Sequence, residues 1–468
     1  MGAIVALIGR PNVGKSTLFN RLTGSRDALV ADLPGLTRDR LFGGGEFAGR
    51  RFSVVDTGGI TDAQDELGEA ISEQAWQAAR EADAVLFMVD ARSGLNAADS
   101  EIALRLRREG LPLHVVVNKS EGQQPQQAVA DFHALGLGQP HAISAERGDG
   151  VERLLRTVFD ALPAADAPDA DDPQADARIR VTIIGRPNAG KSTLINRLAG
   201  AERVLANRQA GTTRDAVQVP LAYRGGEYLF IDTAGIRRRS RVNELPEKLS
   251  VVKALRGIEQ AQVVIVMLDL LEGIAEQDMR LLGHALERGR AAVIALNKSE
   301  SFDEAARRSA RSETDRLAAF APWIERVFVS ALEGRGLAGL MKAVDRAHAS
   351  AGREISTADT NRLLEAAVRA NPPPLVRGRR IKLRYAHPGG LFPPTFVVHG
   401  NQVSSLPDSY RRFLANRFRE GFGLVGTPVR IELRQGDNPY AGRGQNPLSP
   451  SQQRHRHRQR RRLRKQYG

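Results

Sequence analysis

The stretch Gly9-Arg-Pro-Asn-Val-Gly-Lys-Ser16 decides the fold, and a near copy, Gly185-Arg-Pro-Asn-Ala-Gly-Lys-Ser192, lies 176 positions further along the chain. Both fit the pattern G-x-x-x-x-G-K-[ST], in which the backbone N–H groups of a glycine-rich loop hold the phosphates of a nucleotide. Each copy follows an apolar run typical of a strand and begins a run typical of a helix. The sequence therefore predicts two sites for a nucleoside triphosphate.

The two loops belong to a longer internal repeat. Asp56 and Asp232 keep the offset of 176, whereas Asn118 and Asn297 are 179 positions apart. An offset that starts constant and then grows slightly is what a duplication followed by loop growth leaves. Strand-like and helix-like stretches alternate through each copy, so each is predicted to form a mostly parallel sheet with helices on both faces.

Each copy carries further residues suited to a magnesium–triphosphate complex. Lys15 is expected to contact the β- and γ-phosphates, and the Ser16 hydroxyl is expected to ligate Mg²⁺. Thr37 would close on Mg²⁺ and the γ-phosphate as part of a switch loop. Asp56 would hold the water shell of Mg²⁺, and the Gly59 N–H would reach the γ-phosphate. The equivalent residues of the second copy are Lys191, Ser192, Thr213, Asp232 and Gly235.

Two later motifs indicate which base is bound. Asn118-Lys119 follows a strand-like run, and Ser144-Ala145 comes after it. Asn-Lys-x-Asp followed by Ser-Ala is the guanine-binding pattern of translation-factor-like GTPases. In that pattern the lysine stem packs on the base, a carboxylate accepts from guanine N1–H and N2–H₂, and the alanine N–H contacts O6. The second copy has the same motifs at Asn297, Lys298, Ser330 and Ala331, so guanine is predicted at both sites.

Both copies depart from this pattern at one position. Glu121 and Glu300 stand where the pattern has aspartate. Glutamate keeps the charge and both acceptor oxygens, but its extra methylene moves them, and small displacements of a bidentate contact are costly. Because the change occurs twice, we interpret it as tolerated, with a lower guanine affinity or selectivity as the expected effect.

The position for a catalytic side chain also differs from that of Ras-like proteins, which carry a water-orienting glutamine there. Ile60 and Ile236 occupy it here and cannot polarise water. Either hydrolysis is slow or another group supplies the charge. Asn12 and Asn188 match the asparagine that binds potassium in a cation-activated subset of GTPases. We therefore predict potassium as a possible activator, standing where an arginine finger otherwise acts.

Composition narrows the range of partners. The 468 residues carry a formal net charge of +14 and contain no cysteine. The positive charge favours a polyanionic partner, the alternative being solubility alone. The absence of cysteine excludes disulfides, thiolate metal sites and a cysteine nucleophile. No apolar run approaches the roughly 20 residues of a membrane helix. We expect a cytoplasmic protein without a membrane span, and we expect it to be a monomer.

The character of the sequence changes near residue 354. Helix-like stretches at Thr357–Arg369 and Ser409–Arg419 alternate with strand-like stretches at Arg379–Tyr385, Thr395–Val398 and Val429–Arg434. This order, α-β-β-α-β, predicts a small additional α/β domain.

With these motifs in this order, the chain resembles the Der (EngA) family of bacterial ribosome-assembly GTPases over about residues 3–437. Besides the phosphate loops, the matching segments are Asp56-Thr-Gly-Gly59, Asp232-Thr-Ala-Gly235, Gly235–Val242, Asn371-Pro-Pro-Pro374, Pro393-Pro-Thr-Phe396, Ser409-Tyr-Arg-Arg-Phe413 and Gly426-Thr-Pro428. The resemblance implies two tandem G domains followed by a KH-like domain. It also implies GTP-controlled binding to the large ribosomal subunit during its maturation.

Three basic segments are candidates for RNA contact. RNA-binding KH domains clamp the backbone with a Gly-x-x-Gly loop, and here the adjacent pair Gly389-Gly390 stands instead. RNA contact by this domain would then use Arg379, Arg380, Lys382 and Arg384, the alternative being a solvated edge of a packing domain. The other candidates are the run Arg237–Arg241 and the tail segment Arg454–Lys465, which holds eight Lys or Arg and whose alternative role is purely solubilising.

The predicted domain boundaries are 1–162 for the first G domain, 163–177 for an acidic flexible linker, 178–353 for the second G domain, 354–437 for the KH-like domain and 438–468 for a basic disordered tail. The predicted catalytic residues are Lys15, Thr37, Lys191 and Thr213. The predicted nucleotide-binding residues are Gly9, Asn12, Gly14, Lys15, Ser16, Thr17, Asp56, Gly59, Asn118, Lys119, Glu121, Ser144, Ala145, Gly185, Asn188, Gly190, Lys191, Ser192, Thr193, Asp232, Gly235, Asn297, Lys298, Glu300, Ser330 and Ala331. The predicted magnesium ligands are Ser16, Thr37, Asp56, Ser192, Thr213 and Asp232, and the predicted potassium ligands are Asn12 and Asn188.

Taken together, these features predict a GTPase that uses GTP/GDP and magnesium and acts as a switch in assembly of the large ribosomal subunit. GTP would order the loops of Thr37 and Thr213 and rearrange the domains into a form that binds ribosomal RNA. Two alternatives remain open. One is a GTPase associated with RNA modification, and the other is an RNA-binding assembly chaperone whose nucleotide sites are weakened by Glu121 and Glu300.

Overall fold

The computed structural model describes residues 2–24, 42–57, 75–162, 178–201, 218–231, 251–376 and 379–435. These residues form two compact units. The first contains the chain up to residue 354 together with 390–395 and 418–430, and the second contains the remainder of 355–435. The predicted linker at 163–177, the tail at 438–468 and the basic run Arg237–Arg241 lie outside the described residues, so the predicted boundaries there stay predictions.

The first repeat is built on a six-stranded sheet in the order β2-β3-β1-β4-β5-β6. Only β2 and β3 pair antiparallel, and the other neighbours are parallel. The strands are β1 (Ala3–Ile8), β2 (Phe42–Phe47), β3 (Arg50–Asp56), β4 (Ala84–Asp90), β5 (Leu113–Asn118) and β6 (His141–Ala142). The helices are α1 (Lys15–Thr23), α3 (Ala97–Glu109), α4 (Pro125–Val129), the 3₁₀ turn η2 (Ala130–Leu135) and α5 (Val151–Ala161).

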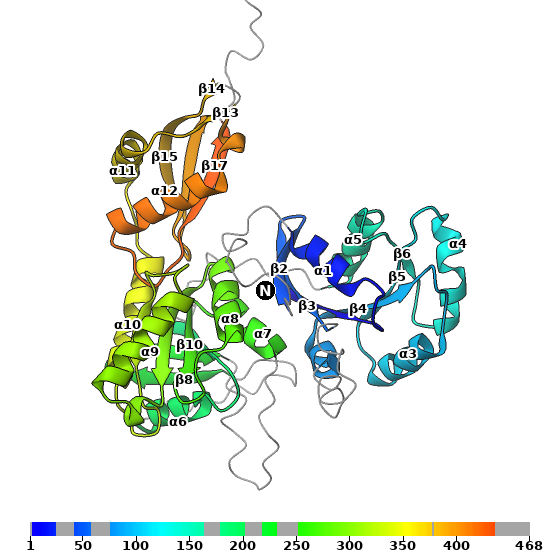
Figure 1. Cartoon of the computed structure of the whole chain (residues 1–468), viewed down its shortest axis with the longest axis horizontal. Coiled ribbons are helices and arrows are strands. Elements are labelled where there is room, and N and C mark those ends of the chain that lie inside the picture. The colour runs from blue at the N-terminus through cyan, green and yellow to red at the C-terminus, as the bar shows by residue number, and fades with distance from the viewer. Residues whose placement is uncertain are drawn as a thin grey trace, which may run out of the picture. The chain divides into compact units, whose positions relative to one another are not determined.

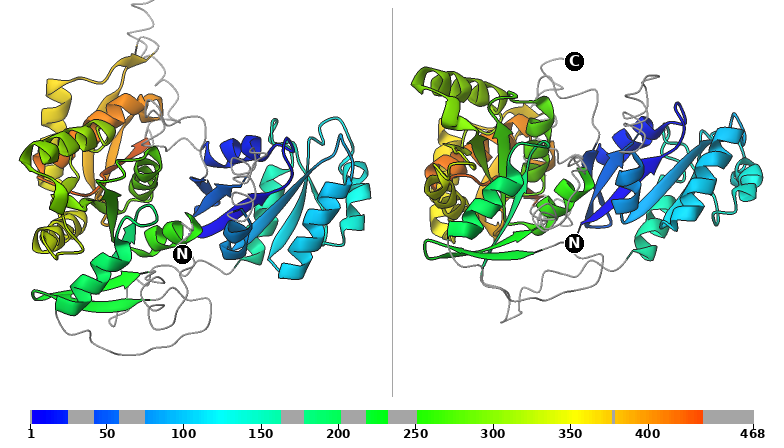
Figure 2. Two further views of the ribbon diagram at one scale, coloured as in Figure 1. Left: turned by 60° about the horizontal axis from the view of Figure 1, so that its bottom comes forward. Right: turned by 90° about the horizontal axis from the view of Figure 1, so that it is seen from below.

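Alternating side chains of this sheet form two separate apolar layers. Leu86 and Met88 of β4 pack in one layer with residues of α1 and α5. Phe87, between them, points to the other layer and packs with Leu106 of α3. Because β4 is buried on both faces, it has the continuous apolar sequence of a central parallel strand. The predicted sheet with helices on both faces is confirmed, as the blue-to-cyan part of Figures 1 and 2 shows.

The second repeat has the same topology, with the order β8-β9-β7-β10-β11-β12. Its strands are β7 (Ile179–Ile184), β8 (Val219–Tyr223), β9 (Gly226–Ile231), β10 (Val263–Asp269), β11 (Ala291–Asn297) and β12 (Glu325–Phe328). Its helices are α6 (Lys191–Ala201), α7 (Val251–Gln260), α8 (Glu276–Glu287), η4 (Ser299–Ser301), α9 (Glu304–Leu317) and α10 (Leu337–Ala351). The identical strand order places the motifs of the two repeats at equivalent strand ends.

The C-terminal elements follow the predicted α-β-β-α-β order and form a three-stranded sheet, β15-β16-β17. They are α11 (Thr357–Ala370), the short pair β13 (Leu375–Val376) and β14 (Arg379–Arg380), β15 (Lys382–Gly390), β16 (Thr395–Asn401), η5 (Val403–Ser405), α12 (Asp408–Gly421) and β17 (Arg430–Gln435). The predicted strand Arg379–Tyr385 is divided: Arg379–Arg380 form β14 in a separate pair, and β15 begins at Lys382 and runs past the predicted end through Pro388. An edge strand tolerates proline because the missing N–H breaks no ladder bond on its open side.

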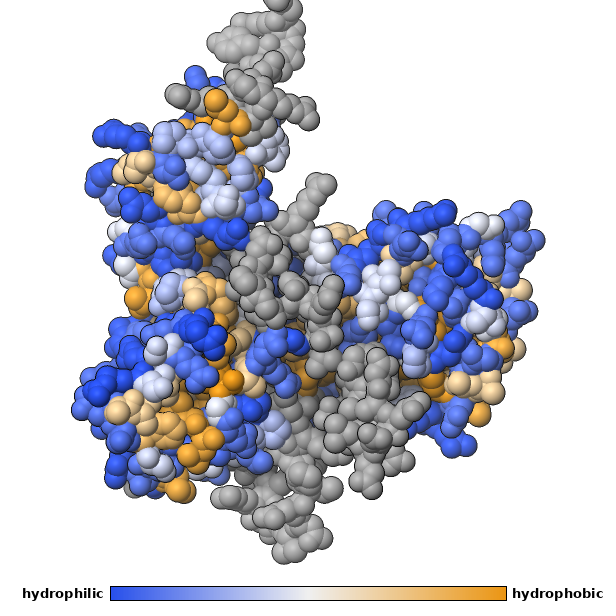
Figure 3. Space-filling model, viewed as in Figure 1, coloured by the Kyte–Doolittle hydropathy of each residue, from blue (hydrophilic) through white to orange (hydrophobic). Residues whose placement is uncertain are grey.

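The surface is largely polar on the face shown in Figure 3, where apolar residues form small scattered groups over the first repeat. Among the residues that the structure describes, no helix is both long and apolar enough to cross a bilayer.

Candidate nucleotide-binding sites

The phosphate loop of each repeat needs glycine at two positions. Gly9 has φ +156° and Gly14 has φ +95°, which side chains rarely adopt. A Cβ atom on Gly9 would lie 2.3 Å from the Met88 carbonyl oxygen, and one on Gly14 would lie 2.3 Å from the amide nitrogen of Asn118. Gly185 and Gly190 of the second repeat meet the same constraints. The loop therefore lies tightly against the ends of β4 and β5.

Helix α1 begins directly after this loop. Its N-cap is Gly14, and no side chain caps the helix. The first N–H groups of a helix have no partner within the helix, and its N-terminus favours negative charge. Without a capping side chain, these donors are available to phosphate oxygens.

The P-loop lysines are anchored alike in both repeats. Lys15 is 5% exposed, and its ammonium group donates to the carbonyl oxygens of Gly9 at 2.7 Å and Arg10 at 2.8 Å. Lys191 donates to Gly185 at 3.1 Å and Arg186 at 2.8 Å. Each ammonium group thus lies over its own loop, where the phosphates of a nucleotide would be held.

The first repeat brings two predicted magnesium ligands together. The Ser16 hydroxyl donates to Asp56 Oδ2 at 2.9 Å, and Asp56, at the end of β3, is buried. A hydroxyl beside a carboxylate is a set of hard oxygen ligands, which suits Mg²⁺. Ser192 holds the equivalent place on α6. Its predicted partner Asp232 lies outside the described residues.

Asn118 joins the phosphate loop to the Ser-Ala loop. Its side-chain amide donates to the Val13 carbonyl at 2.9 Å and accepts from the Ala145 N–H at 2.8 Å. Asn297 makes the same pair of bonds, to the Ala189 carbonyl at 2.7 Å and from the Ala331 N–H at 3.0 Å. The Ala145 and Ala331 N–H groups, which are predicted to contact guanine O6, each donate to one of these buried amide oxygens in the structure, and the contact with O6 stays a prediction.

The base-site lysines are held by aspartates that the motif does not include. Lys119 Nζ lies 2.7 Å from Asp90 Oδ2 and donates to the Asn12 carbonyl at 2.8 Å. Lys298 pairs in the same way with Asp269. Burial disfavours ionised Asp90, but hydrogen bonds from Lys119 and the Arg92 N–H outweigh it and lower the pKa of Asp90. The lysine stem is therefore fixed beside the phosphate loop.

The two unusual glutamates share one property. Among the residues that the structure describes, Oε2 of Glu121 and Oε2 of Glu300 are both buried and have no hydrogen-bond partner. Glu121 pairs with Arg92 through its other oxygen. The residue's own backbone N–H lowers the pKa of Glu121 most, Ser144 and the charge of Arg92 add to this, and together they outweigh the opposing effect of burial. A buried ionised oxygen without a donor is costly, and a guanine N–H would satisfy it.

Asn12 and Asn188 lie at exposed positions of the two phosphate loops. Both have left-handed backbones, with φ of +66° and +60°, a conformation that asparagine adopts more readily than most residues. An amide oxygen is a hard ligand, so the chemistry of this position is compatible with a monovalent cation.

Two arginine–aspartate pairs escaped the sequence analysis. Arg10 Nε lies 3.1 Å from Asp99 Oδ1, and Arg186 Nε lies 3.1 Å from Asp278 Oδ2. Burial raises the pKa of both aspartates even though the arginines oppose it. Each pair ties the phosphate loop to the start of α3 or α8.

A third arginine position was also missed. Arg21 of α1 donates to the Ala145 carbonyl at 2.5 Å, and Arg197 of α6 donates to the Leu332 carbonyl at 2.6 Å. The repeat itself held the signal for these residues. Arg10 and Arg186 are 176 positions apart, as are Arg21 and Arg197, and this is the offset of the two phosphate loops. Asp99 and Asp278 are 179 positions apart, which is the offset of the base-site asparagines.

Several predicted residues cannot be placed. Thr37, Gly59, Thr213, Asp232 and Gly235 lie outside the described residues. Of the predicted magnesium ligands, the structure therefore places Ser16, Asp56 and Ser192.

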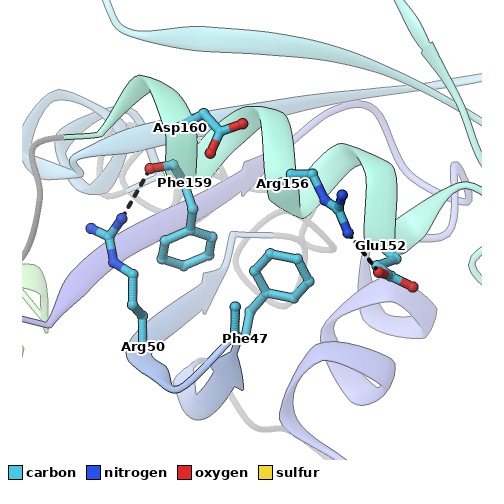
Figure 4. Close-up of a pocket in the computed structure, with 7 residues that line it drawn as sticks. Phe47, Arg50, Glu152, Arg156, Phe159 and Asp160 are labelled. Carbon is cyan, nitrogen blue, oxygen red and sulfur yellow. Dashed lines mark hydrogen bonds and ion pairs between the residues drawn. The ribbon is translucent and has the colours of Figure 1, made fainter.

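A separate hollow of about 460 Å³ lies between the turn after β2 and helix α5 (Figure 4). Arg50 donates to the Phe159 carbonyl at 3.0 Å, and the rings of Phe47 and Phe159 are 5.7 Å apart. The other lining residues are Ala48, Glu152, Arg156 and Asp160. None of them belongs to the nucleotide motifs, so this hollow is distinct from the phosphate loop.

The fold and site define a class. Each repeat combines a six-stranded sheet, a glycine-rich phosphate loop with a buried or half-buried lysine, and an Asn-Lys motif joined to a Ser-Ala loop. This combination defines a P-loop GTPase with two nucleotide-binding domains.

Comparison with known proteins identifies the family. Residues 4–119 and 180–298 match the model described as 50S ribosome-binding GTPase. Residues 354–434 match the KH-domain-like C-terminal domain of EngA bacterial GTPase enzymes. The chain is similar to GTPase Der of Thioalkalivibrio sulfidiphilus, at 51% identity over 96% of this chain and 97% of the relative. It is also similar to GTPase Der of Halorhodospira halophila, at 53% over 95% and 94%, and of Citrobacter koseri, at 46% over 99% and 100%.

The chain belongs to the Der family of GTPases. It is a GTP-binding, GTP-hydrolysing enzyme with two tandem G domains and a KH-like domain, as the motifs predicted.

Proposed function

We propose that this GTPase is a nucleotide-controlled switch in the maturation of the large ribosomal subunit. In this proposal GTP binding changes the arrangement of the domains into a form that binds the subunit and its ribosomal RNA, and hydrolysis releases it. The observation that carries the proposal is that both repeats keep the same polar framework around the nucleotide site. The description of the matching family model, a 50S ribosome-binding GTPase, indicates the partner.

Within this framework, different groups would bind the phosphates and the guanine base. Lys15 and Lys191 would exchange their loop carbonyl partners for phosphate oxygens and stabilise the charge that develops during transfer. The N–H groups at the start of α1 and α6 would bind the phosphates. Glu121 and Glu300 would accept the guanine N–H donors through their buried oxygens.

Magnesium would be held by Ser16, Thr37 and Asp56 in the first domain and by Ser192, Thr213 and Asp232 in the second, and it would neutralise charge on the β- and γ-phosphates. Ser16 and Asp56 already lie in contact. The loops of Thr37 and Thr213 would then respond to the presence of the γ-phosphate.

Potassium is proposed as the activator of hydrolysis. Ile60 and Ile236 cannot orient water, and the exposed asparagines Asn12 and Asn188 would supply amide oxygens to the cation. The amide oxygens and the adjacent phosphate oxygens are the ligands that such a cation requires.

Co-sedimentation with isolated large ribosomal subunits tests the switch. The full-length chain should co-sediment through a sucrose gradient to different extents with GTP, GDP and a non-hydrolysable GTP analogue. Lys15→Ala and Lys191→Ala should each reduce that nucleotide dependence. Comparing the sizes of the two reductions shows which nucleotide site controls co-sedimentation. Co-sedimentation that is the same in all nucleotide states would refute the switch.

A further inference from the structure

The KH-like sheet carries a cluster of three rings, the Tyr385 cluster, which the nucleotide sites do not use. Tyr385 and His387 lie on β15, and His399 lies on β16. The ring centroids of Tyr385 and His399 are 4.4 Å apart with planes within 6°, so these rings stack face to face. The His387 ring is 5.3 Å from that of His399. Tyr385 is 46% exposed.

The cluster is held in one arrangement by hydrogen bonds. His387 Nδ1 lies 2.8 Å from the Pro388 carbonyl oxygen, and the Nε2 atoms of His387 and His399 are 3.2 Å apart. Because a carbonyl can only accept, Nδ1 of His387 carries a hydrogen. When His387 is neutral, its Nε2 therefore accepts and His399 Nε2 donates. Burial, with the nearby His387 and Arg434, lowers the pKa of His399.

The cluster is not part of the hydrophobic core. Ala386 lies between Tyr385 and His387, points to the opposite face of β15 and is fully buried. Asn361 of α11 bonds both backbone groups of Ala386, at 2.8 Å each, and so anchors this strand. The rings therefore stand on the other face, where a large part of Tyr385 is left to solvent.

The domain that carries the rings is positively charged, and one of its arginines acts on them. Residues 354–434 contain thirteen Lys or Arg and six Asp or Glu. Lys382 and Arg384 are exposed at the start of β15, but alternation along the strand places them on the Ala386 face, opposite the rings. Arg434 of β17 acts electrostatically on His399 and remains 64% exposed while it pairs with Glu432 at 4.0 Å. Aromatic faces within a positively charged surface are the means by which proteins bind single-stranded nucleic acid.

We propose that the Tyr385 cluster is a stacking platform for an unpaired RNA base. The base would continue the column formed by His399 and Tyr385, and the Arg434 side chain would contact an adjacent phosphate. The inference deepens the proposed function and rests on it for RNA as the ligand. It places recognition on a sheet face and needs no Gly-x-x-Gly clamp.

A metal site explains the cluster less well. The imidazole separation alone would allow a shared metal, but among the described residues no group of three or more His, Cys, Asp or Glu is placed to hold one. Tyr385, which contributes the most exposed ring, would also have no role in such a site.

The test measures binding of the full-length chain to a fluorescein-labelled twelve-nucleotide adenosine RNA and to a duplex of the same length, by fluorescence anisotropy over a series of KCl concentrations. Tyr385→Ala should weaken binding of the single strand about tenfold, within the range found for base–aromatic stacking. Tyr385→Phe keeps the ring and should bind within twofold of the unchanged chain. The control is Leu375→Ala, an exposed apolar residue of the same unit outside the cluster, which should also bind within twofold.

The salt series separates stacking from phosphate contacts. The basic tail and other cations contribute binding that falls steeply with salt, whereas the ratio between Tyr385→Ala and the unchanged chain should persist. GTP turnover of Tyr385→Ala should be unchanged, because Tyr385 lies outside the nucleotide sites. Equal affinity of Tyr385→Ala and the unchanged chain would overturn the proposal, as would an equal loss in Tyr385→Phe.

Two further outcomes are decisive. Loss of RNA binding on addition of EDTA would assign the imidazoles to a metal and overturn the platform. Nucleotide-dependent co-sedimentation with the large subunit, together with unchanged oligonucleotide binding by Tyr385→Ala, would refute the platform alone. Nucleotide-independent co-sedimentation, with the tenfold effect intact, would refute the switch alone.

Discussion

Replacing Asn118 with alanine should detach the Ser-Ala loop from the phosphate loop of the first G domain. The Asn118 side chain bonds the Val13 carbonyl at 2.9 Å and the Ala145 N–H at 2.8 Å, and the residue is 2% exposed. Alanine would leave both backbone groups without this partner. Each buried unsatisfied group costs about 1–3 kcal/mol, so for the two groups we expect the free energy of unfolding of this domain to fall by about 2–6 kcal/mol.

A second substitution tests whether the geometry is correct. In Gly14→Ala the new Cβ would lie 2.3 Å from the Asn118 amide nitrogen, and alanine would also be strained at φ +95°. Asn118→Ala removes the collision and leaves the strain. The cost of Gly14→Ala should therefore be smaller, by about 1 kcal/mol or more, when Asn118 is already alanine.

Urea unfolding of the four chains of this cycle, with GDP binding measured on each, provides the assay. A Lys191→Ala background keeps the second site from masking the first. Asn297→Ala is the matched variant, since it removes bonds of 2.7 and 3.0 Å from the second domain. The reasoning fails if Asn118→Ala costs less than about 0.5 kcal/mol, or if the two substitutions are simply additive.

Three other predictions concern the base site, the cation and pH. Glu121→Ala removes a buried oxygen that has no hydrogen-bond partner among the described residues. It should therefore lower the preference for GTP over ATP about tenfold in competition binding while leaving stability nearly unchanged, and an unaltered preference would contradict the assignment. GTP turnover should be faster in potassium than in sodium buffer, and equal rates would remove Asn12 and Asn188 from the mechanism. Burial lowers the pKa of His114 and His141 in the first domain. The histidines of the unfolded chain titrate at about pH 6.5, so below that pH the folded chain binds fewer protons than the unfolded chain. The urea concentration at the unfolding midpoint should therefore fall as the pH drops below that value. His141→Gln should make the midpoint less dependent on pH.

Much of the fold could be predicted from local sequence. Each phosphate loop lies between a strand and a helix that are contiguous with it, and the loop chemistry requires glycine at fixed positions such as Gly9 and Gly14. Because the second copy repeats the same motifs, the same reasoning predicted the fold of the second domain. The length of β15 was the visible error, because proline normally ends a strand and here the strand lies at the edge of its sheet.

The framework of the site was harder to predict. Arg10 and Asp99 are 89 positions apart, and Asn118 is 105 positions from Val13. These contacts exist because parallel strands deliver their carboxyl ends to one edge of the sheet. A single copy of the sequence gives no reason to pair these residues, although the equal offsets of the two repeats would have pointed to them.

The sequence by itself determined the chemistry of this protein: two phosphate loops, the guanine-type motifs, a basic C-terminal domain and membership of a GTPase family. Only the tertiary structure decided which polar groups serve each other. In the structure the Ala145 N–H donates to Asn118, and Tyr385 stacks on His399 of a neighbouring strand. Oε2 of Glu121 and of Glu300 has no hydrogen-bond partner among the described residues. The physical reason is that residue type fixes which bonds a group can form, whereas strand pairing fixes which partner comes within reach.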